Sequence, residues 1–143
     1  MKLIGPASAA EFEQYYDLRW KILRAPWNQP RGSEQDTLDA TSIHVMVIAD
    51  NKVALGVGRL HFNTISEAQI RFMAVDVGHQ RRGIGTLILK ALETRGAELG
   101  ATRIVLDARE TALGFYCKLG YSTTGPGPML YDRIAHVKMS KLL

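Results

Sequence analysis

The stretch that most constrains this chain is Gln80–Thr86, with the sequence QRRGIGT, together with what lies on either side of it. The apolar run Ile70–Val75 precedes it and is typical of a buried strand. A strand, a glycine-containing turn and a helix N-terminus together favour a phosphate site, because first-turn N–H groups have no partner within the helix and carry the positive end of its dipole. One apolar face of the following helix is predicted from helical spacing, with the members Ile84, Leu87, Ile88, Ala91 and Leu92.

The glycines and arginines of this turn can be read in two ways. Gly83 and Gly85 lack the Cβ atoms that would keep a phosphate away from the backbone, and Arg81 and Arg82 add positive charge. Alternatively, the glycines mark only a turn and a close helix–strand contact, and the arginines are solvated. Spacing excludes two common phosphate loops, because no lysine follows Gly85 and because Ile88 stands where a dinucleotide loop has its third glycine.

A second motif, Ala112–Tyr121 with the sequence ALGFYCKLGY, follows downstream. The pattern Q-x-x-G-x-G after a strand, followed by A-x-x-F-Y-x-x-x-G-[FY], resembles the GNAT superfamily of acetyl-CoA-dependent N-acetyltransferases. Leu18–Arg24 and Ile134–Val137 resemble the ElaA-type branch. The resemblance implies a single-domain α/β fold, in which a mixed central sheet of about six to seven strands has splayed central strands and flanking helices.

The resemblance also implies roles for individual residues. Tyr116 stands at the family's tyrosine position and would protonate the leaving thiolate, since a phenol of pKa ~10 is protonated at neutral pH. A purely structural alternative is that Tyr116 packs its helix against the cofactor. Arg109 stands where relatives have Asn, and it would reach a phosphate or remain a solvated charge. The remaining acetyl-CoA contacts implied are Met73, Ala74 and Val75 for the pantetheine and thioester, Gln80, Arg81, Arg82, Gly83, Ile84, Gly85 and Thr86 for the pyrophosphate, and Phe115.

The general base is not assigned by these motifs. Many relatives carry Glu or His on the strand before the loop, but this chain has Gln69 at that register, and an amide cannot usefully accept a proton. Glu67, His61 and His136 are the substitutes, each acting through water, and an acceptor amine of low pKa would need no base. Cys117 is expected to be a small buried hydrophobe and not a nucleophile.

Composition limits the classes of protein to which this chain can belong. The 143 residues, 46% of them hydrophobic, suit one domain over residues 1–143. No run reaches the ~18 to 20 apolar residues of a membrane helix, and Met1–Pro6 is too short for a signal peptide. One cysteine excludes an intramolecular disulfide, which favours a cytoplasmic protein. The four histidines lack metal-ligand spacing, so no metal is expected; they are His44, His61, His79 and His136.

Alternating hydrophobic and turn patterns predict the order of elements, and hairpins followed by strand–helix–strand units favour a mixed sheet. The segment Pro26–Asp39 is predicted to be a loop, with or without a short helix, and is the best candidate for a segment that faces the substrate. A turn is predicted at Gly125–Pro128. The expected strands are Lys2–Ile4, Ile43–Ala49, Val53–Phe62, Ile70–Val75, Arg103–Ala108, Tyr121–Thr124 and Ile134–Met139, and the expected helices begin near Ser8, Ile84 and Thr111.

Together these patterns predict an N-acetyltransferase that moves an acetyl group from acetyl-CoA to a primary amine of a small molecule or peptide, by direct attack in a ternary complex. One alternative is a non-catalytic acyl-CoA sensor, for which Gln69 is the best argument. A second is a nucleic-acid-binding module that uses Arg81 and Arg82. The net charge of +4 permits this, but the basic residues are spread along the chain, and a coenzyme A pocket explains the charge equally well. Exposed edge strands near the C-terminus could pair two protomers.

Overall fold

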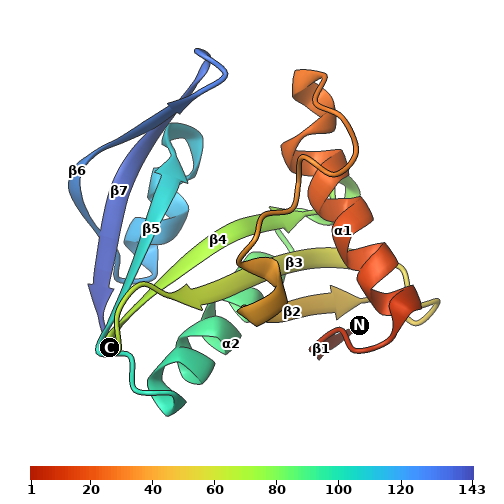
Figure 1. Cartoon of the computed structure of the whole chain (residues 1–143), viewed down its shortest axis with the longest axis horizontal. Helices are drawn as coiled ribbons and strands as arrows, with labels where there is room; N and C mark the ends of the chain where they lie inside the picture. The colour runs from red at the N-terminus through yellow and green to blue at the C-terminus, as the bar shows by residue number, and fades with distance from the viewer.

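The computed structural model describes all residues of the chain, 1–143. Its centre is one seven-stranded sheet in the order β1-β2-β3-β4-β5-β7-β6, with helices on both faces (Figure 1). The predicted mixed α/β sheet is therefore confirmed. The strands are β1 (Lys2–Ile4), β2 (Ile43–Ile48), β3 (Ala54–Phe62), β4 (Glu67–Val75), β5 (Arg103–Arg109), β6 (Ser122–Leu130) and β7 (Ile134–Leu142). The α-helices are α1 (Ala9–Leu23), α2 (Ile84–Glu98) and α3 (Leu113–Lys118).

Helix α1 begins at the capping box that the sequence predicts. The Ser8 hydroxyl accepts from the Glu11 N–H at 3.1 Å, and the Glu11 carboxylate accepts from the Ser8 N–H at 3.1 Å. The helix buries Tyr15 and Leu18 against one face of the sheet. After α1, the chain forms two short 3₁₀ helices, η1 (Ala25–Trp27) and η2 (Asp39–Thr41), at the two ends of the predicted loop Pro26–Asp39.

The central strands β4 and β5 are paired along only about half of their length. They pair in parallel from Glu67↔Arg103 to Ile70↔Leu106, and no pairing continues beyond. Both strands nevertheless extend further, β4 to Val75 and β5 to Arg109. Figure 1 shows the two strands leaving a common region near the C-terminus and diverging, with β7 and β6 following β5. The splay expected from the resemblance is present, and it leaves one edge of β4 unpaired over its last residues.

A β-bulge lies in β4 at the point where the splay opens. Val57 pairs with Ala74 and Arg59 pairs with Arg71, so two residues of β4 stand opposite Gly58 alone. One of these two residues is Phe72, whose φ of 57° is unusual for a bulky side chain. An extra residue reverses which face later side chains take. As a result, Ile70 packs on the α2 side of the sheet, whereas Ala74 packs on the α1 side.

Helix α2 covers the face of the sheet opposite α1. Its apolar face matches the predicted stripe except at Leu87, which is 45% exposed, because the helix is turned so that Leu89 is buried in its place. Two strand glycines allow the close approach. A Cβ on Gly56 would lie 2.6 Å from Ile84 Cγ2, and a Cβ on Gly58 would lie 2.6 Å from Ile88 Cγ2.

The predicted turn at Gly125–Pro128 is wrong. These residues lie within β6, and the chain reverses instead after Leu130, where Tyr131 and Asp132 have φ of 53° and 54°. Strand β6 is the outer strand of the sheet, where a missing proline N–H is tolerated, and its pairing with β7 shifts register between Pro126 and Met129. Pro126 and Pro128 each lack an N–H, so this strand has fewer backbone donors than an ordinary strand. None of the helices is long and apolar enough to cross a membrane.

Candidate active site

The loop Gln80–Thr86 presents a set of free backbone donors. None of its N–H groups has a hydrogen-bond acceptor within the chain, because the first bond of α2 runs from Leu87 N to Gly83 O at 3.0 Å. Arg81 and Gly83 have φ of 64° and 81°. Alternation of left-handed and right-handed residues turns successive N–H groups toward one side, which makes an anion-binding concavity. The side chains of Arg81 and Arg82 are exposed and without ion pairs, so their charge adds to this site.

Gly83 and Gly85 are required for different reasons, the first for its backbone conformation and the second for lack of space. No atom lies within 4 Å of the position that a Gly83 Cβ would take, so its positive φ is what a side chain would strain. A Cβ on Gly85 would lie 3.2 Å from Cζ of Phe115. The first motif therefore needs this glycine so that an aromatic ring of the second motif can lie against the start of α2.

The unpaired edge of β4 lies close to the second motif as well. Met73 and Val75 are half-buried on the α2 side, and Ala74 is buried on the other side. The Tyr116 hydroxyl lies 3.6 Å from the Met73 Sδ. The Tyr116 ring also makes edge contacts with Phe115 and Tyr121 at centroid distances of 5.0 and 5.8 Å. The splayed edge, the loop and α3 thus meet at one place.

Burial changes the acidity of Tyr116. Removal of the phenol from water raises its pKa to about 12. The hydroxyl is therefore protonated at neutral pH and available as a donor. Apart from the Met73 sulfur, which is a weak acceptor, it has no hydrogen-bond partner within the chain.

Two of the three candidate bases are already engaged. Arg59 donates to His61 Nδ1 at 3.1 Å, and the remaining ring nitrogen Nε2 donates to Asn63 Oδ1 at 3.1 Å, so neutral His61 has no free lone pair. Burial, followed by the neighbouring Arg59, lowers the pKa of His61. Glu67 accepts from Asn63 and forms an ion pair with Arg103, and these bonds lower its pKa. Glu67 also stands at the closed end of the splay.

His136 differs from the other two. Its Nδ1 lies 3.1 Å from the Pro128 carbonyl oxygen and 3.0 Å from that of Ile134, so Nδ1 carries the proton and Nε2 keeps a free lone pair. His136 is the cross-strand partner of Arg109 between β7 and β5. Paired residues of neighbouring strands share one face of a sheet. His136 and Arg109 therefore point to the face opposite α2, since Ala108 packs in the core on the α2 side.

A buried charge network that the sequence analysis missed lies beside the bulge. Arg19 of α1 and Arg59 of β3 are both 0% exposed. Each donates to Asp39 Oδ1, at 3.0 and 3.2 Å, and Arg59 also donates to Asp36 Oδ1 at 2.6 Å. Burial alone would raise the pKa of Asp39, but a backbone N–H and the two guanidinium groups hold it below its usual value. The signal for this network was an arginine inside the otherwise apolar strand Ala54–Leu60.

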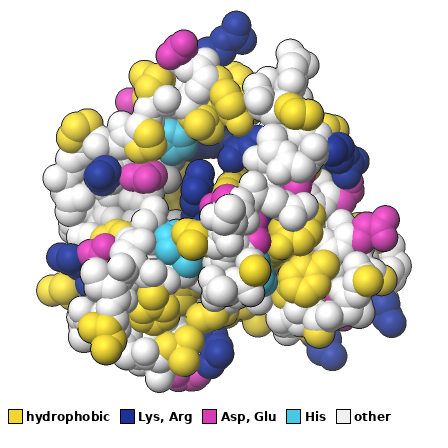
Figure 2. Space-filling model, viewed as in Figure 1, with side chains coloured by type: hydrophobic (Ala, Val, Ile, Leu, Met, Phe, Trp, Pro, Cys, Tyr) yellow, Lys and Arg dark blue, Asp and Glu magenta, His cyan; other side chains and the backbone are white.

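Phe72 is the centre of this part of the face. Four guanidinium carbons lie over its ring, at 4.3, 5.6, 4.8 and 4.6 Å from the centroid; they belong to Arg19, Arg24, Arg59 and Arg71. Figure 2 shows a hollow in the middle of this face, with basic, acidic and histidine side chains around it. The segment that was predicted to face the substrate contains Asp36 and Asp39, and both carboxylates accept hydrogen bonds from Arg59 on this face.

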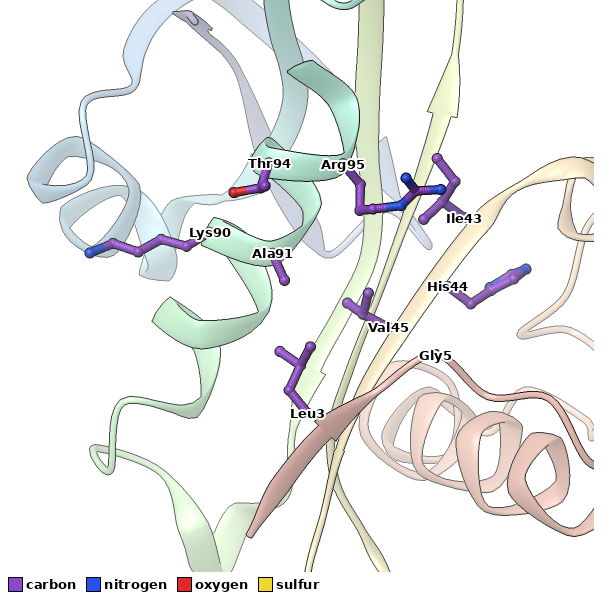
Figure 3. Close-up of a pocket in the computed structure, with 9 residues that line it drawn as sticks. All are labelled: Leu3, Gly5, Ile43, His44, Val45, Lys90, Ala91, Thr94 and Arg95. Atoms are coloured by element: carbon purple, nitrogen blue, oxygen red, sulfur yellow. The ribbon is translucent and has the colours of Figure 1, made fainter. Parts of the chain in front are cut away.

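Two other features lie outside this site. A cavity of about 480 Å³ separates α2 from the β1–β2 edge and has the apolar residues Leu3, Ile43, Val45 and Ala91 in its lining (Figure 3). None of the expected cofactor residues lines it. Cys117 is exposed on α3, so its expected burial is wrong; the six-residue helix directs this position outward while Tyr116 packs inward.

The sequence model of the acetyltransferase (GNAT) family matches residues 12–121, which include both motifs and the splayed strands. The chain belongs to the GNAT acetyltransferase family. It is therefore an acyl-CoA-dependent acetyltransferase. The predicted resemblance is confirmed.

Relatives and solved structures cover nearly the whole chain. YjcF of Bacillus subtilis, described as an uncharacterized N-acetyltransferase, is 28% identical over 141 residues, 99% of each chain. An aminoglycoside 6'-N-acetyltransferase solved with coenzyme A superposes with a TM-score of 0.81 at 18% identity, over 99% of this chain and 97% of that one. Escherichia coli ElaA superposes with a TM-score of 0.79 at 16% identity, over 98% and 97%. At these identities the two structures show a shared fold.

Proposed function

We propose that residues 1–143 form one domain that moves an acetyl group from acetyl-CoA to the primary amine of a small molecule or peptide. The observation that carries this proposal is the meeting of the free N–H groups of Gln80–Thr86 with the unpaired edge of β4. The loop offers donors and positive charge for a pyrophosphate. The β4 edge offers main-chain groups for the pantetheine arm at Met73, Ala74 and Val75, and Phe115 packs between the two.

Acetyl-CoA supplies the thioester, and the acceptor amine attacks it directly in a ternary complex. The nitrogen lone pair forms a bond to the carbonyl carbon, the carbon–sulfur bond breaks, and the sulfur leaves with its electron pair. The Tyr116 hydroxyl donates a hydrogen bond or its proton to this sulfur and recovers the proton from water. A pKa of about 12 makes full transfer to a thiol of pKa ~8.5 unfavourable, which favours the hydrogen-bonding role.

The proton released by the amine needs an acceptor. Of the three candidate bases, only His136 has a ring nitrogen, Nε2, without a partner. It lies on the face of the sheet opposite α2. We assign it this role, directly or through a water molecule. Gln69 accepts a hydrogen bond from Asn63 at 2.9 Å and belongs to the structural network around His61.

Titration with acetyl-CoA by calorimetry tests the cofactor site. Micromolar binding is expected for the wild type, and Gly83→Glu should abolish it because a carboxylate and a strained φ enter the phosphate loop. Gly125→Glu is the matched control, since it adds the same charge in β6 where nothing lies within 4 Å of a Cβ. Thermal unfolding of each variant separates loss of binding from loss of fold. A folded wild-type protein that binds neither acetyl-CoA nor CoA would contradict the proposal.

A further inference from the structure

Three guanidinium groups lie on the face of the sheet opposite α2, and only one of them, that of Arg71, makes an ion pair. The first belongs to Arg24, which ends α1 and is only 7% exposed. Its donors reach backbone carbonyls alone, Nε to Ser33 O at 3.0 Å and Nη1 to Leu23 O at 3.1 Å. Burial of a charge with no direct ion pair is costly, and the Glu34 carboxylate, which acts on Arg24 through space, offsets only part of this cost.

The second and third are Arg109 and Arg71. Arg109 ends β5, is half-buried, and makes no hydrogen bond or ion pair in the structure. Arg71 stands one residue before the bulge, and its side chain is 49% exposed. Its one ion pair is to Asp36 Oδ2 at 3.2 Å, and Arg59 already holds the other oxygen of that carboxylate at 2.6 Å.

These groups converge from three separate elements on two aromatic rings. The Arg24 and Arg71 guanidinium carbons lie 5.6 and 4.6 Å from the Phe72 centroid, and that of Arg24 lies 6.0 Å from the Tyr131 centroid. Burial lowers the pKa of Arg109, and the nearby Tyr131 hydroxyl opposes this. Burial also lowers the pKa of Arg24, with Tyr131 opposing this and Arg109 adding to it. The turn after β6 thus brings Tyr131 between the end of α1 and the end of β5.

The carboxylates on this face are fewer than the guanidinium groups, since Glu34, Asp36, Asp39 and Asp107 stand against Arg19, Arg24, Arg59, Arg71 and Arg109. Asp39 lies between Arg19 and Arg59, and Asp36 lies between Arg59 and Arg71. The Glu34 carboxylate is buried and accepts from Gly32 N and Gln35 Nε2. Arg109, which pairs with none of these carboxylates, leaves positive charge for a ligand where β5 diverges from β4.

We propose that Arg24, Arg71 and Arg109 bind an anionic group of the acceptor, so that the substrate is an amine that also carries a carboxylate or a phosphate. Guanidinium groups match both anions through paired N–H donors. The proposal rests on the acetyltransferase function proposed above. The proposal also assigns Arg109 to the acceptor and not to a phosphate of the cofactor, because its side chain leaves β5 on the face opposite α2. Polycationic amines would be repelled by the same cluster.

Matched pairs of amines test the acceptor class. β-Alanine is compared with β-alaninamide for the carboxylate and phosphoethanolamine with ethanolamine for the phosphate, with kanamycin as the polycation. We expect the anionic member of at least one pair to have a kcat/KM tenfold or more above its neutral partner, measured by CoA release. Equal rates within both pairs, or faster turnover of kanamycin, would overturn the proposal.

A charge-removing variant locates the site. Arg109→Gln should lower kcat/KM at least tenfold for the preferred anionic amine and less than threefold for its neutral partner, with an unchanged Kd for acetyl-CoA. Arg109→Lys should recover part of the loss. The control is Arg133→Gln, an exposed arginine on the same turn as Tyr131. If Arg109→Gln affects both amines equally, the assignment is wrong.

Binding without turnover gives an independent measurement. Succinate and phosphoethanolamine are titrated into protein saturated with CoA, so that the phosphate loop is already filled. Binding that weakens at least tenfold in Arg109→Gln supports the arginine cluster even if none of the amines reacts. No binding of either probe to the wild type would overturn it. Loss of acetyl-CoA binding itself, in contrast, would reject the underlying acetyltransferase function.

Discussion

The Tyr116 hydroxyl lies 3.6 Å from the sulfur of Met73, which joins the second sequence motif to the splayed edge of β4. Met73 follows the bulge at Phe72, and its side chain turns toward α2 because that bulge reverses the faces of the strand. The phenol is thereby held where the strand edge becomes unpaired. This placement supports the proposal that the phenol donates to the leaving sulfur.

Removal of this hydroxyl should slow chemistry without weakening cofactor binding. We expect Tyr116→Phe to lower kcat at least tenfold, within the ~10² to 10⁴ range of positioned proton donors, and to leave the Kd of acetyl-CoA within twofold. Steady-state rates of CoA release and calorimetry measure the two quantities. Unchanged turnover would mean that Tyr116 only packs α3 against its neighbours.

The contact between Gly85 and Phe115 should be sensitive to a single methyl group. A Cβ at 3.2 Å from the ring forces Phe115 to shift, so Gly85→Ala should raise the Kd of acetyl-CoA by about three- to tenfold. The matched control is Gly114→Ala, where nothing lies within 4 Å of the new atom. Equal affinities in both variants would show that the position of this ring does not matter for binding.

The network beside the bulge should be essential for stability. Asp39→Ala leaves Arg19 and Arg59 buried with less compensation, and breaking a buried ion pair typically costs about 3 to 5 kcal/mol. Asp50→Ala, at a fully exposed carboxylate, should change the free energy of unfolding by less than about 0.5 kcal/mol. Urea unfolding at pH 7 compares the two. A small effect at Asp39 would indicate that water reaches the arginines.

Acid should remove the contribution of Asp36 to the free energy of unfolding. Burial alone would raise its pKa, but the bonds from Arg59 and from a backbone N–H bring it below the ordinary value of 3.8. The unfolded chain therefore binds the proton first as pH falls, and stability is lost below about pH 4. The difference in unfolding free energy between wild type and Asp36→Asn should be constant from pH 7 to 5 and shrink below 4. A constant difference down to pH 2.5 would contradict a lowered pKa.

The two half-buried histidines should behave differently on substitution. His136→Gln should lower kcat at least tenfold because it removes the one free imidazole nitrogen among the candidate bases. His61→Gln should change kcat less than threefold, since both nitrogens of His61 already have partners, although it should destabilise the fold. Rates with a saturating amine measure this. Similar losses in both variants would point to a water-mediated base elsewhere.

Local pattern determined much of this protein. Ser8 and Glu11 specify the start of α1, helical spacing specifies α2, and the two motifs specify the family and the loop Gln80–Thr86, because each depends on residues close together in sequence. Prediction from local sequence failed where the same residues are compatible with two structures. Gly125–Pro128 is typical of a turn, yet an outer strand accepts the same residues because its edge N–H groups need no partner.

Only the tertiary structure decided how distant residues meet. The bulge at Phe72 depends on pairing with Gly58, and the order of the faces after it depends on that bulge. The cluster joins Arg24 at the end of α1, Arg71 in the middle of β4 and Arg109 at the end of β5, and no sequence spacing relates them. The sequence by itself determined a strand–loop–helix that can hold a phosphate, since those groups are neighbours along the chain. The proposed acceptor site depends on the tertiary structure, because its three arginines come together only when β4 and β5 diverge in the folded sheet.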